Sequence, residues 1–357
     1  MNTRPTALDS LTGIRGLAAW FVVFYHVRSG MGGYAPEAVM AVLAKGYLAV
    51  DLFFMLSGFV LWLNYADAMR DRALSAAPRF YWRRIARVWP LHIVILAGLV
   101  AFALALIATH RADDTAYPLA ELPLHIAMLQ NWGLTDTLSW NHPAWSISCE
   151  FAAYLLFPVL AWSVDWRKAG SITLIAAIVA LAGLAWRVID TPGLGDDIPR
   201  LGLWRCLIEF TMGTMLCALW QRWRGDRRAA PIAAGALAIA IAGWTAGLAE
   251  TFIVPLMLAA LLALLAFGDD ARRNPLRARP FVWLGEISYA TYLAHFPLFI
   301  LFKLAFVEDP ARIAPALLAL YLSLVLLASA LLYRWVEKPA QRALNHLASG
   351  TRSAAHA

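Results

Sequence analysis

The chain has 357 residues, of which 61% are hydrophobic and only 15% are charged, and its mean hydropathy is +0.62. These values exclude an ordinary soluble domain and predict an all-α polytopic membrane protein. The net charge of +7 does not indicate a nucleic-acid partner, because the basic residues lie in short clusters between apolar segments.

Ten apolar segments are long enough to cross a bilayer as helices, which predicts a bundle of about ten transmembrane helices. The segments are 9–28, 46–65, 88–109, 142–162, 170–189, 201–220, 229–247, 249–268, 281–303 and 312–334. The apolar stretch 122–132 is too short to span, so we expect an interfacial or re-entrant segment there. The break at 247–250 separates two helices by almost no loop. Merging these two helices would leave nine spans and put the termini on opposite sides.

The positive charges predict the orientation of the bundle. With the N-terminus inside, 21 of the 30 Lys and Arg residues fall in inner connections and only 7 in outer ones. This bias predicts that both termini are cytoplasmic. We expect one integral-membrane domain, 1–348, followed by a short flexible tail, 349–357.

Two ionisable residues, Arg15 and His26, lie within the otherwise apolar stretch from Leu11 to Val27. Charged groups are costly inside a bilayer, so their presence indicates function by default. Eleven residues are close to three helical turns, which places both side chains on one face, about 16 Å apart along the axis. This arrangement suits a ligand that runs between a cation and an imidazole. The alternative is a snorkelling arginine at the inner end and an interfacial histidine at the outer end.

Two further arginines, Arg84 and Arg87, lie where the third segment enters the membrane from the inner side. Their i, i+3 spacing places them on one helix face. Guanidinium groups at this depth suit phosphates, which they bind through two parallel hydrogen bonds. The alternative is that they, like Arg83, belong only to a positive-inside patch.

A second cluster of ionisable residues is expected near the outer face, and it predicts a polar cavity that opens outward. Glu150 is the hardest member to explain structurally, because an unpaired carboxylate in mid-helix is costly. It can orient an imidazole and stabilise its protonated form. Arg205 and Glu209 also have the spacing of a structural i, i+4 ion pair, and His295 is equally consistent with a buried core histidine. The members are His26, Asp51, Glu150, Arg205, Glu209 and His295.

The three cysteines, Cys149, Cys206 and Cys217, all fall in predicted spans and show no CxxC or Cys/His spacing. We interpret them as small buried hydrophobic residues, with neither a disulfide framework nor a zinc site. The predicted site therefore contains no metal ligand.

The residues above lie in six strings that resemble motifs of the acyltransferase-3 family of membrane O-acyltransferases. The strings occur in the family's order from Leu11 to about Pro339. They are LTGIRGLAAWFVVFYH from Leu11, VDLFFMLSGFVL from Val50, RRIARVWP from Arg83, WSISCEFAAYLLFP from Trp145, ISYATYLAHFP from Ile287 and YRWVEKP from Tyr333. One such string is a weak signal, but six in order are specific.

The resemblance implies transfer of an acyl group, usually acetyl, from cytoplasmic acyl-CoA to a hydroxyl of an extracytoplasmic acceptor, commonly a sugar. It implies that His26 is the catalytic histidine and that Arg15, Arg84 and Arg87 are functional. A carboxylate that is common near the start of the family's first helix is replaced here by Thr12, so its role is not carried over. Some relatives carry a fused esterase-like domain, for which we expect this chain to be too short. The expected location is a bacterial inner membrane.

The chemistry of acyl-CoA agrees with these residues. The inner arginines would hold its phosphates, while the long pantetheine arm would bring the thioester to His26. His26 could deprotonate the acceptor hydroxyl or accept the acyl group itself, and the sequence leaves both routes open. Glu150 is predicted as the catalytic partner of His26. The residues predicted to bind a glycan or glycolipid acceptor are Asp51, Arg205 and His295.

Two other functional classes remain. A transporter or flippase would use the same residues as a substrate path, but no clear internal repeat or pair of broken spans supports it. A scaffold subunit would leave both clusters of ionisable residues unexplained.

Overall fold

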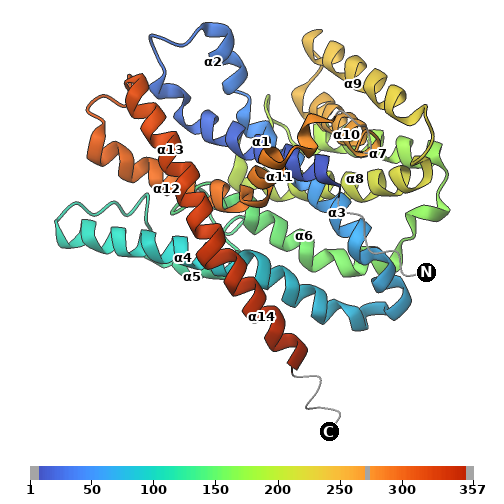
Figure 1. Ribbon diagram of the computed structural model, residues 1–357, viewed down its shortest axis with the longest axis horizontal. Helices are drawn as coiled ribbons and strands as arrows, with labels where there is room; N and C mark the ends of the chain where they lie inside the picture. Colours follow the sequence, from blue (N-terminus) through green and yellow to red (C-terminus); the bar gives the residue numbers. More distant parts are fainter. Residues whose placement is uncertain (1–7, 270–273, 351–357) are drawn as a thin grey trace. The chain divides into compact units, whose positions relative to one another are not determined.

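The computed structural model describes residues 8–269 and 274–350 (Figure 1). In this part of the chain the regular elements are helices, and the only β-type pairing is an isolated bridge between Met31 and Arg312. The protein is therefore all-α, as its composition predicts. Its chain divides into two compact units, each built from segments that are not contiguous in sequence.

Unit 1 comprises residues 1–18, 48–77 and 149–286. Within it, α9 and α10 form a hairpin and lie side by side in Figure 1. Its described α-helices are the first part of α1 (Asp9–Val27), α3 (Ala49–Arg72), most of α6 (Ala144–Ser163), α7 (Ser171–Val188), α8 (Ile198–Trp223), α9 (Ala229–Thr245), α10 (Glu250–Phe267) and α11 (Arg279–Glu286).

Two glycines allow α3 and α8 to approach each other closely in unit 1. A Cβ atom at Gly58 would lie 1.9 Å from the carbonyl oxygen of Phe210, and one at Gly213 would lie 1.9 Å from that of Met55. Any side chain at either position would collide with the opposing backbone. Small residues at such a contact are typical of helices that pack inside a membrane.

Unit 2 comprises residues 19–47, 78–148 and 287–357. Within it, α12 and α13 pack against each other and are neighbours in Figure 1. Its described helices are the rest of α1, α2 (Glu37–Leu43), nearly all of α4 (Ala77–Ala108), α5 (Leu122–Ala127), α12 (Ser288–Phe306), α13 (Pro315–Leu332), the π-helical η7 (Tyr333–Glu337) and α14 (Lys338–Gly350), with short 3-10 turns between some of them.

An apolar core joins α1, α12 and α13 in unit 2. Val23 of α1, Phe299 of α12 and Tyr321 of α13 belong to this core, and Tyr321 is completely buried. The Tyr321 hydroxyl donates a hydrogen bond of 2.8 Å to the carbonyl oxygen of His295. The core therefore fixes the part of α12 that carries His295.

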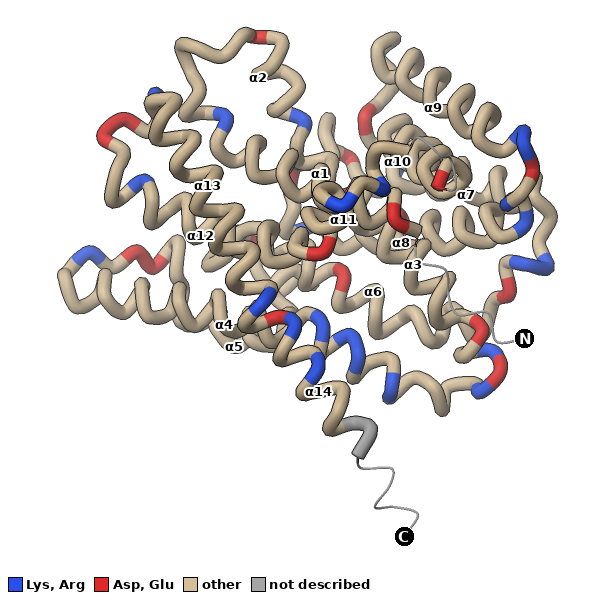
Figure 2. Tube along the Cα trace, viewed as in Figure 1, with Lys and Arg blue, Asp and Glu red and all other residues tan. Residues whose placement is uncertain are grey.

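Eight helical stretches of the described chain are long and apolar enough to cross a membrane. One of them, Glu37–Ala108, contains both α3 and α4, whereas α9 is apolar but only 17 residues long. Neither α9 nor α13 carries a charged residue, and Figure 2 shows both without blue or red along their length. These features are those of an integral membrane protein. The count of ten spans and the cytoplasmic termini stay predictions.

Two helix boundaries differ from the prediction. α4 begins at Ala77 rather than at residue 88, because charged residues oppose burial in lipid without opposing helix formation. Arg84 and Arg87 consequently lie inside a helix. The predicted segment 281–303 is divided into α11 and α12 around Ile287.

Two predictions about short segments are confirmed. The stretch 122–132 contains only the six-residue α5, which is too short to span, while its interfacial or re-entrant position stays a prediction. The break at 247–250 separates α9 from α10, and Gly247 adopts a φ of +92° there. Most of the predicted tail, 349–357, lies outside the described residues, and the prediction of one domain over 1–348 stays untested.

Candidate active site

Two histidines of unit 2, His26 of α1 and His295 of α12, lie in contact. His295 Nε2 is 3.2 Å from His26 Nδ1, and the ring centroids are 5.0 Å apart. His26 Nδ1 is also 3.0 Å from the carbonyl oxygen of Val22. His295 is completely buried, and its Nδ1 lies 3.1 Å from the carbonyl oxygen of Thr291. The structure thus brings together two histidines that are 269 residues apart.

Aromatic rings surround the His26 imidazole. Phe296 of α12 and Tyr25 of α1 both meet it edge-on, with ring centroids 5.4 Å and 5.0 Å away. Phe296 also stacks on His142, at a centroid distance of 4.8 Å and an angle of 23°. Burial lowers the pKa of His142 below its usual value, which favours a neutral ring at pH 7. A third imidazole therefore lies beside the histidine pair.

Buried hydrogen bonds attach α12 to the segment that carries His142. Asn141 Nδ2 donates to the carbonyl oxygen of Leu293 over 3.0 Å. The Tyr292 hydroxyl donates to the carbonyl oxygen of Pro143 over 2.9 Å and lies 2.7 Å from Ser146 Oγ. These bonds fix the start of α6 against the same turn of α12 that presents His295 and Phe296.

Arg87, one of the predicted phosphate-binding arginines of α4, forms an ion pair with a carboxylate. Arg87 donates to the carboxylate of Glu337, which is buried in η7, and its guanidinium lies 5.7 Å from the centre of the Tyr289 ring. The Arg84 guanidinium lies 5.9 Å from the centre of the Phe80 ring. π-Helical turns such as η7 occur frequently at functional sites.

Arg15 and His26 lie on one continuous helix, α1, as the sequence predicts. Arg15 is half-buried and belongs to unit 1, whereas Arg84 and Arg87 belong to unit 2. Binding of one ligand by all three arginines stays a prediction.

Asp51 and Arg205, both predicted to bind the acceptor, form a buried ion pair in unit 1. The Arg205 guanidinium donates to both carboxylate oxygens of Asp51 and, over 2.7 Å, to the carbonyl oxygen of Leu194. Asp51 is 0% exposed and Arg205 is 2% exposed. Arg205 is therefore held by Asp51 on another helix, whereas its i, i+4 spacing suggests Glu209 as the partner. This burial indicates a structural role, and contact with an acceptor stays a prediction.

Glu150 lies on α6, half-buried and close to the thiol of Cys206 on α8. It belongs to unit 1 and His26 to unit 2, so their pairing stays a prediction. Cys206 is buried together with Cys149 and Cys217, as predicted. Among the described residues no group of three His, Cys, Asp or Glu side chains is arranged to hold a metal ion.

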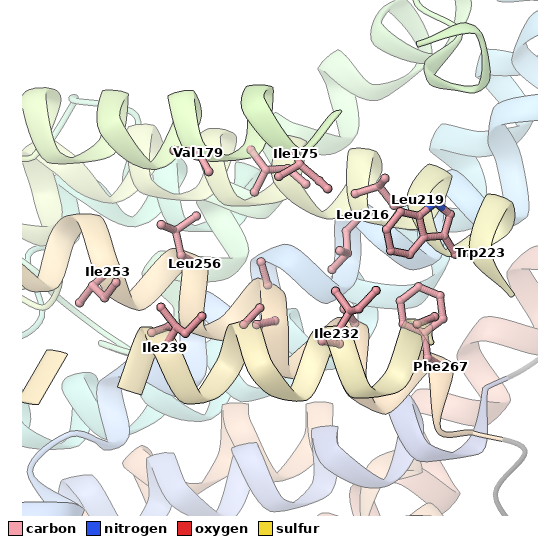
Figure 3. Close-up of a pocket in the computed structure, with 18 residues that line it drawn as sticks. Ile175, Val179, Leu216, Leu219, Trp223, Ile232, Ile239, Ile253, Leu256 and Phe267 are labelled. Carbon is pink, nitrogen blue, oxygen red and sulfur yellow. The ribbon is translucent and has the colours of Figure 1, made fainter. Parts of the chain in front are cut away.

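An apolar cavity of about 350 Å³ lies between α7, α8, α9 and α10 in unit 1 (Figure 3). Its lining consists of aliphatic and aromatic side chains, such as Ile175, Leu219 and Phe267. The one ring nitrogen in the lining, Trp223 Nε1, donates to Ser171 Oγ. The cavity therefore offers no group for acid–base or nucleophilic chemistry.

Three residues of the site were not predicted from the sequence. His142 lies just before the string that contains Glu150. A histidine at that position could have indicated a further member of the site. Glu337 lies in the YRWVEKP string. A carboxylate next to an apolar segment could have indicated a partner for a buried arginine. Phe296 had no signal beyond its position next to His295.

Comparison with known proteins extends over most of the chain. The family described as the acyltransferase domain matches residues 8–334. Acyltransferase MdmB of Streptomyces mycarofaciens is 31% identical over 96% of this chain and 94% of its own length. O-acetyltransferase OatA of Staphylococcus aureus is 22% identical over 95% of this chain, which spans 58% of OatA. No solved structure matches. The chain therefore belongs to the acyltransferase family.

Proposed function

We propose that the protein transfers an acyl group, most simply acetyl, from cytoplasmic acyl-CoA to a hydroxyl of an extracytoplasmic glycan or glycolipid. The proposed location is a bacterial inner membrane. The observation that carries the proposal is the position of His26, whose imidazole lies against His295 in a chain that matches an acyltransferase family over residues 8–334. The name of the relative OatA, an O-acetyltransferase, supports an acetyl donor and an oxygen acceptor.

His26 would act as the base in this reaction. Its Nε2 takes the proton of the acceptor hydroxyl while the hydroxyl oxygen attacks the thioester carbonyl carbon. The new C–O bond forms, the C–S bond breaks, and the sulfur of CoA receives the proton from Nε2. The products are an ester and free CoA thiol. If labelled donor without acceptor yields a covalent acyl-His26 intermediate, the reaction follows the two-step route through acyl-His26 and not direct transfer.

The arginines would hold the anionic end of the donor. Arg84 and Arg87 lie one turn apart on α4, and Arg15 lies on the helix that leads to His26. Guanidinium groups bind phosphate through a planar pair of N–H donors, which a lysine does not provide. Glu150, which lies on α6, is proposed as the catalytic partner of His26. Whether Asp51, Arg205 and His295 contact the acceptor is tested by substitution, because a variant at a contact residue raises the KM for the acceptor.

Purified protein in proteoliposomes tests the reaction class. The probes are radiolabelled acetyl-CoA and a glycan and glycolipid extract from cells that lack the protein. We expect ester-linked label in the extract and release of one CoA per ester. Uptake of glycan or CoA across the bilayer without ester formation would instead establish a transporter.

A further inference from the structure

Backbone carbonyl groups fix where the protons of the histidine pair lie. His295 Nδ1 faces the carbonyl oxygen of Thr291 at 3.1 Å, and His26 Nδ1 faces that of Val22 at 3.0 Å. A carbonyl oxygen only accepts hydrogen bonds, so both Nδ1 atoms must carry a hydrogen. A neutral imidazole carries one N–H, and therefore each Nε2 presents a lone pair. The 3.2 Å contact is then an N–H of His26 donating to Nε2 of His295.

We propose that His295 is a positioning residue that, together with the Val22 carbonyl, holds His26 in the Nδ1–H tautomer and aims its Nε2 lone pair at the reacting groups. This inference rests on the proposed function. It differs from an acceptor-binding role for His295, because a completely buried side chain that already uses both nitrogens has no atom left for a substrate.

The remaining contacts of His26 agree with this assignment. Its Nδ1 is shared between two acceptors, whereas among the described residues Nε2 makes no hydrogen bond. Phe296 and Tyr25 contact the ring in T-shaped arrangements and are not hydrogen-bond partners of it. Nε2 is therefore the one nitrogen of His26 that can take a proton from the hydroxyl group that receives the acyl group. A ring in the other tautomer would present an N–H there and could not act as a base.

His295 can position the His26 ring because contacts from neighbouring residues fix its own position. Its carbonyl oxygen accepts the Tyr321 hydroxyl over 2.8 Å, and its ring lies 6.0 Å from that of Tyr292. Tyr292 in turn is fixed by the carbonyl oxygen of Pro143. When Nε2 of His26 becomes protonated, the Nδ1–H bond to His295 strengthens, because the donor is then charged. The same contact thus orients the base and stabilises its protonated form.

Three substitutions of His295 separate this role from simple packing. In His295→Gln the side-chain oxygen is as far from Cα, counted in bonds, as Nε2, so it can accept from His26. In His295→Asn the amide reaches only as far as Nδ1, where its Nδ2 can donate to the Thr291 carbonyl, and no acceptor reaches His26. His295→Phe fills the volume without an acceptor. We expect kcat to fall on the order of 10²-fold in the Asn and Phe variants and to recover in the Gln variant.

The KM for acyl-CoA should be unchanged in all three variants, because His295 does not touch the donor. Equal activity of the Gln, Asn and Phe variants would overturn the proposal, as would a change confined to the acceptor KM. A variant that does not fold is recognised by its loss of a monodisperse peak. The tautomer itself is then measured directly in the unmodified protein.

¹⁵N NMR of histidine-labelled protein in nanodiscs provides that measurement, with His26→Ala identifying the signals. We expect a protonated Nδ1 and an unprotonated Nε2 for His26. The opposite pattern would overturn the proposal even if every His295 variant misfolds. If His26→Ala retains full activity, the proposed function of His26 fails; if His26→Ala is inactive but His295→Phe is fully active, only the role of His295 fails.

Discussion

At the scale of single residues, the ion pair of Arg87 bears directly on its predicted role in binding the donor. Arg87 forms an ion pair with Glu337, whose side chain is only 1% exposed, while that of Arg87 is 22% exposed. Removing one member of a buried pair leaves an uncompensated charge, which is destabilising. A phosphate of the donor would restore the missing negative charge. Glu337 therefore determines how strongly Arg87 attracts a ligand.

The substitution Glu337→Gln tests this link. We expect a lower thermal stability without ligand, by roughly 1–3 kcal/mol after allowance for the solvent near Arg87. Added CoA should then raise the melting temperature of the variant by more than that of the unmodified protein, because bound ligand stabilises the folded state. Thermal unfolding with and without CoA measures both effects. Glu308→Gln, an exposed acid, is the control. An equal CoA effect in all three proteins would show that Arg87 does not contact phosphate.

At the scale of elements, the short α5 is fixed by a buried network of hydrogen bonds, since six residues are too few to span the membrane. His125 Nε2 lies 2.9 Å from Ser139 Oγ, and Ser139 donates to Glu121 over 2.6 Å. His92 of α4 contributes a hydrogen bond of 2.7 Å to the carbonyl oxygen of His125. Hydropathy predicts that this segment does not span, but it cannot predict a network whose members are up to 47 residues apart. Such networks depend on how the helices pack.

This network predicts a pH dependence of the segment 119–141. Burial, followed by the charges of His92 and His142, lowers the pKa of His125 from 6.5 to about 4. The unfolded segment binds a proton as the pH falls through 6.5, whereas the folded segment does not until about pH 4. Stability is therefore complete above pH 6.5 and is lost as the pH falls from 6.5 to 4, by at most about 1.4 kcal/mol per pH unit.

Hydrogen exchange at pH 7.5 and pH 5 measures the effect, after correction for the intrinsic exchange rate. We expect faster exchange of residues 119–141 at pH 5 in the unmodified protein. The difference should shrink in His125→Gln and persist in His110→Gln, which changes an exposed histidine. A pH effect of full size in His125→Gln would assign the titration to another group, such as His142.

At the scale of the whole molecule, the sequence predicts the helices better than the site. Each apolar segment must satisfy its own backbone hydrogen bonds inside a membrane, so hydropathy indicates helices such as α7 and α10 well. The division between α11 and α12 and the π-helical η7 are not visible in hydropathy, because packing determines them. His26 was predicted from its isolation in an apolar helix. The sequence groups His295 with His26 in one outer cluster, but it does not predict the direct contact between their rings, since no local pattern relates residues 269 positions apart.

The predicted orientation gives a whole-molecule test. The connection between α3 and α4 should face the cytoplasm, and the connection after α4 should face outward, because basic residues favour the inner side. An impermeant thiol reagent added to intact cells should therefore label Asp114→Cys and not Ser75→Cys, both exposed positions. The native cysteines are buried and give little background. Labelling of Ser75→Cys alone would reverse the orientation.

The most direct test of the account is a single-turnover comparison of the unmodified protein with His26→Ala. Labelled acetyl-CoA and the glycan and glycolipid extract are mixed with excess protein in nanodiscs, and ester formation and CoA release are followed together. The account predicts that His26→Ala binds acetyl-CoA normally but forms ester at least about 10²-fold more slowly, since the base is missing. Ester formation at the normal rate by folded His26→Ala protein would contradict it.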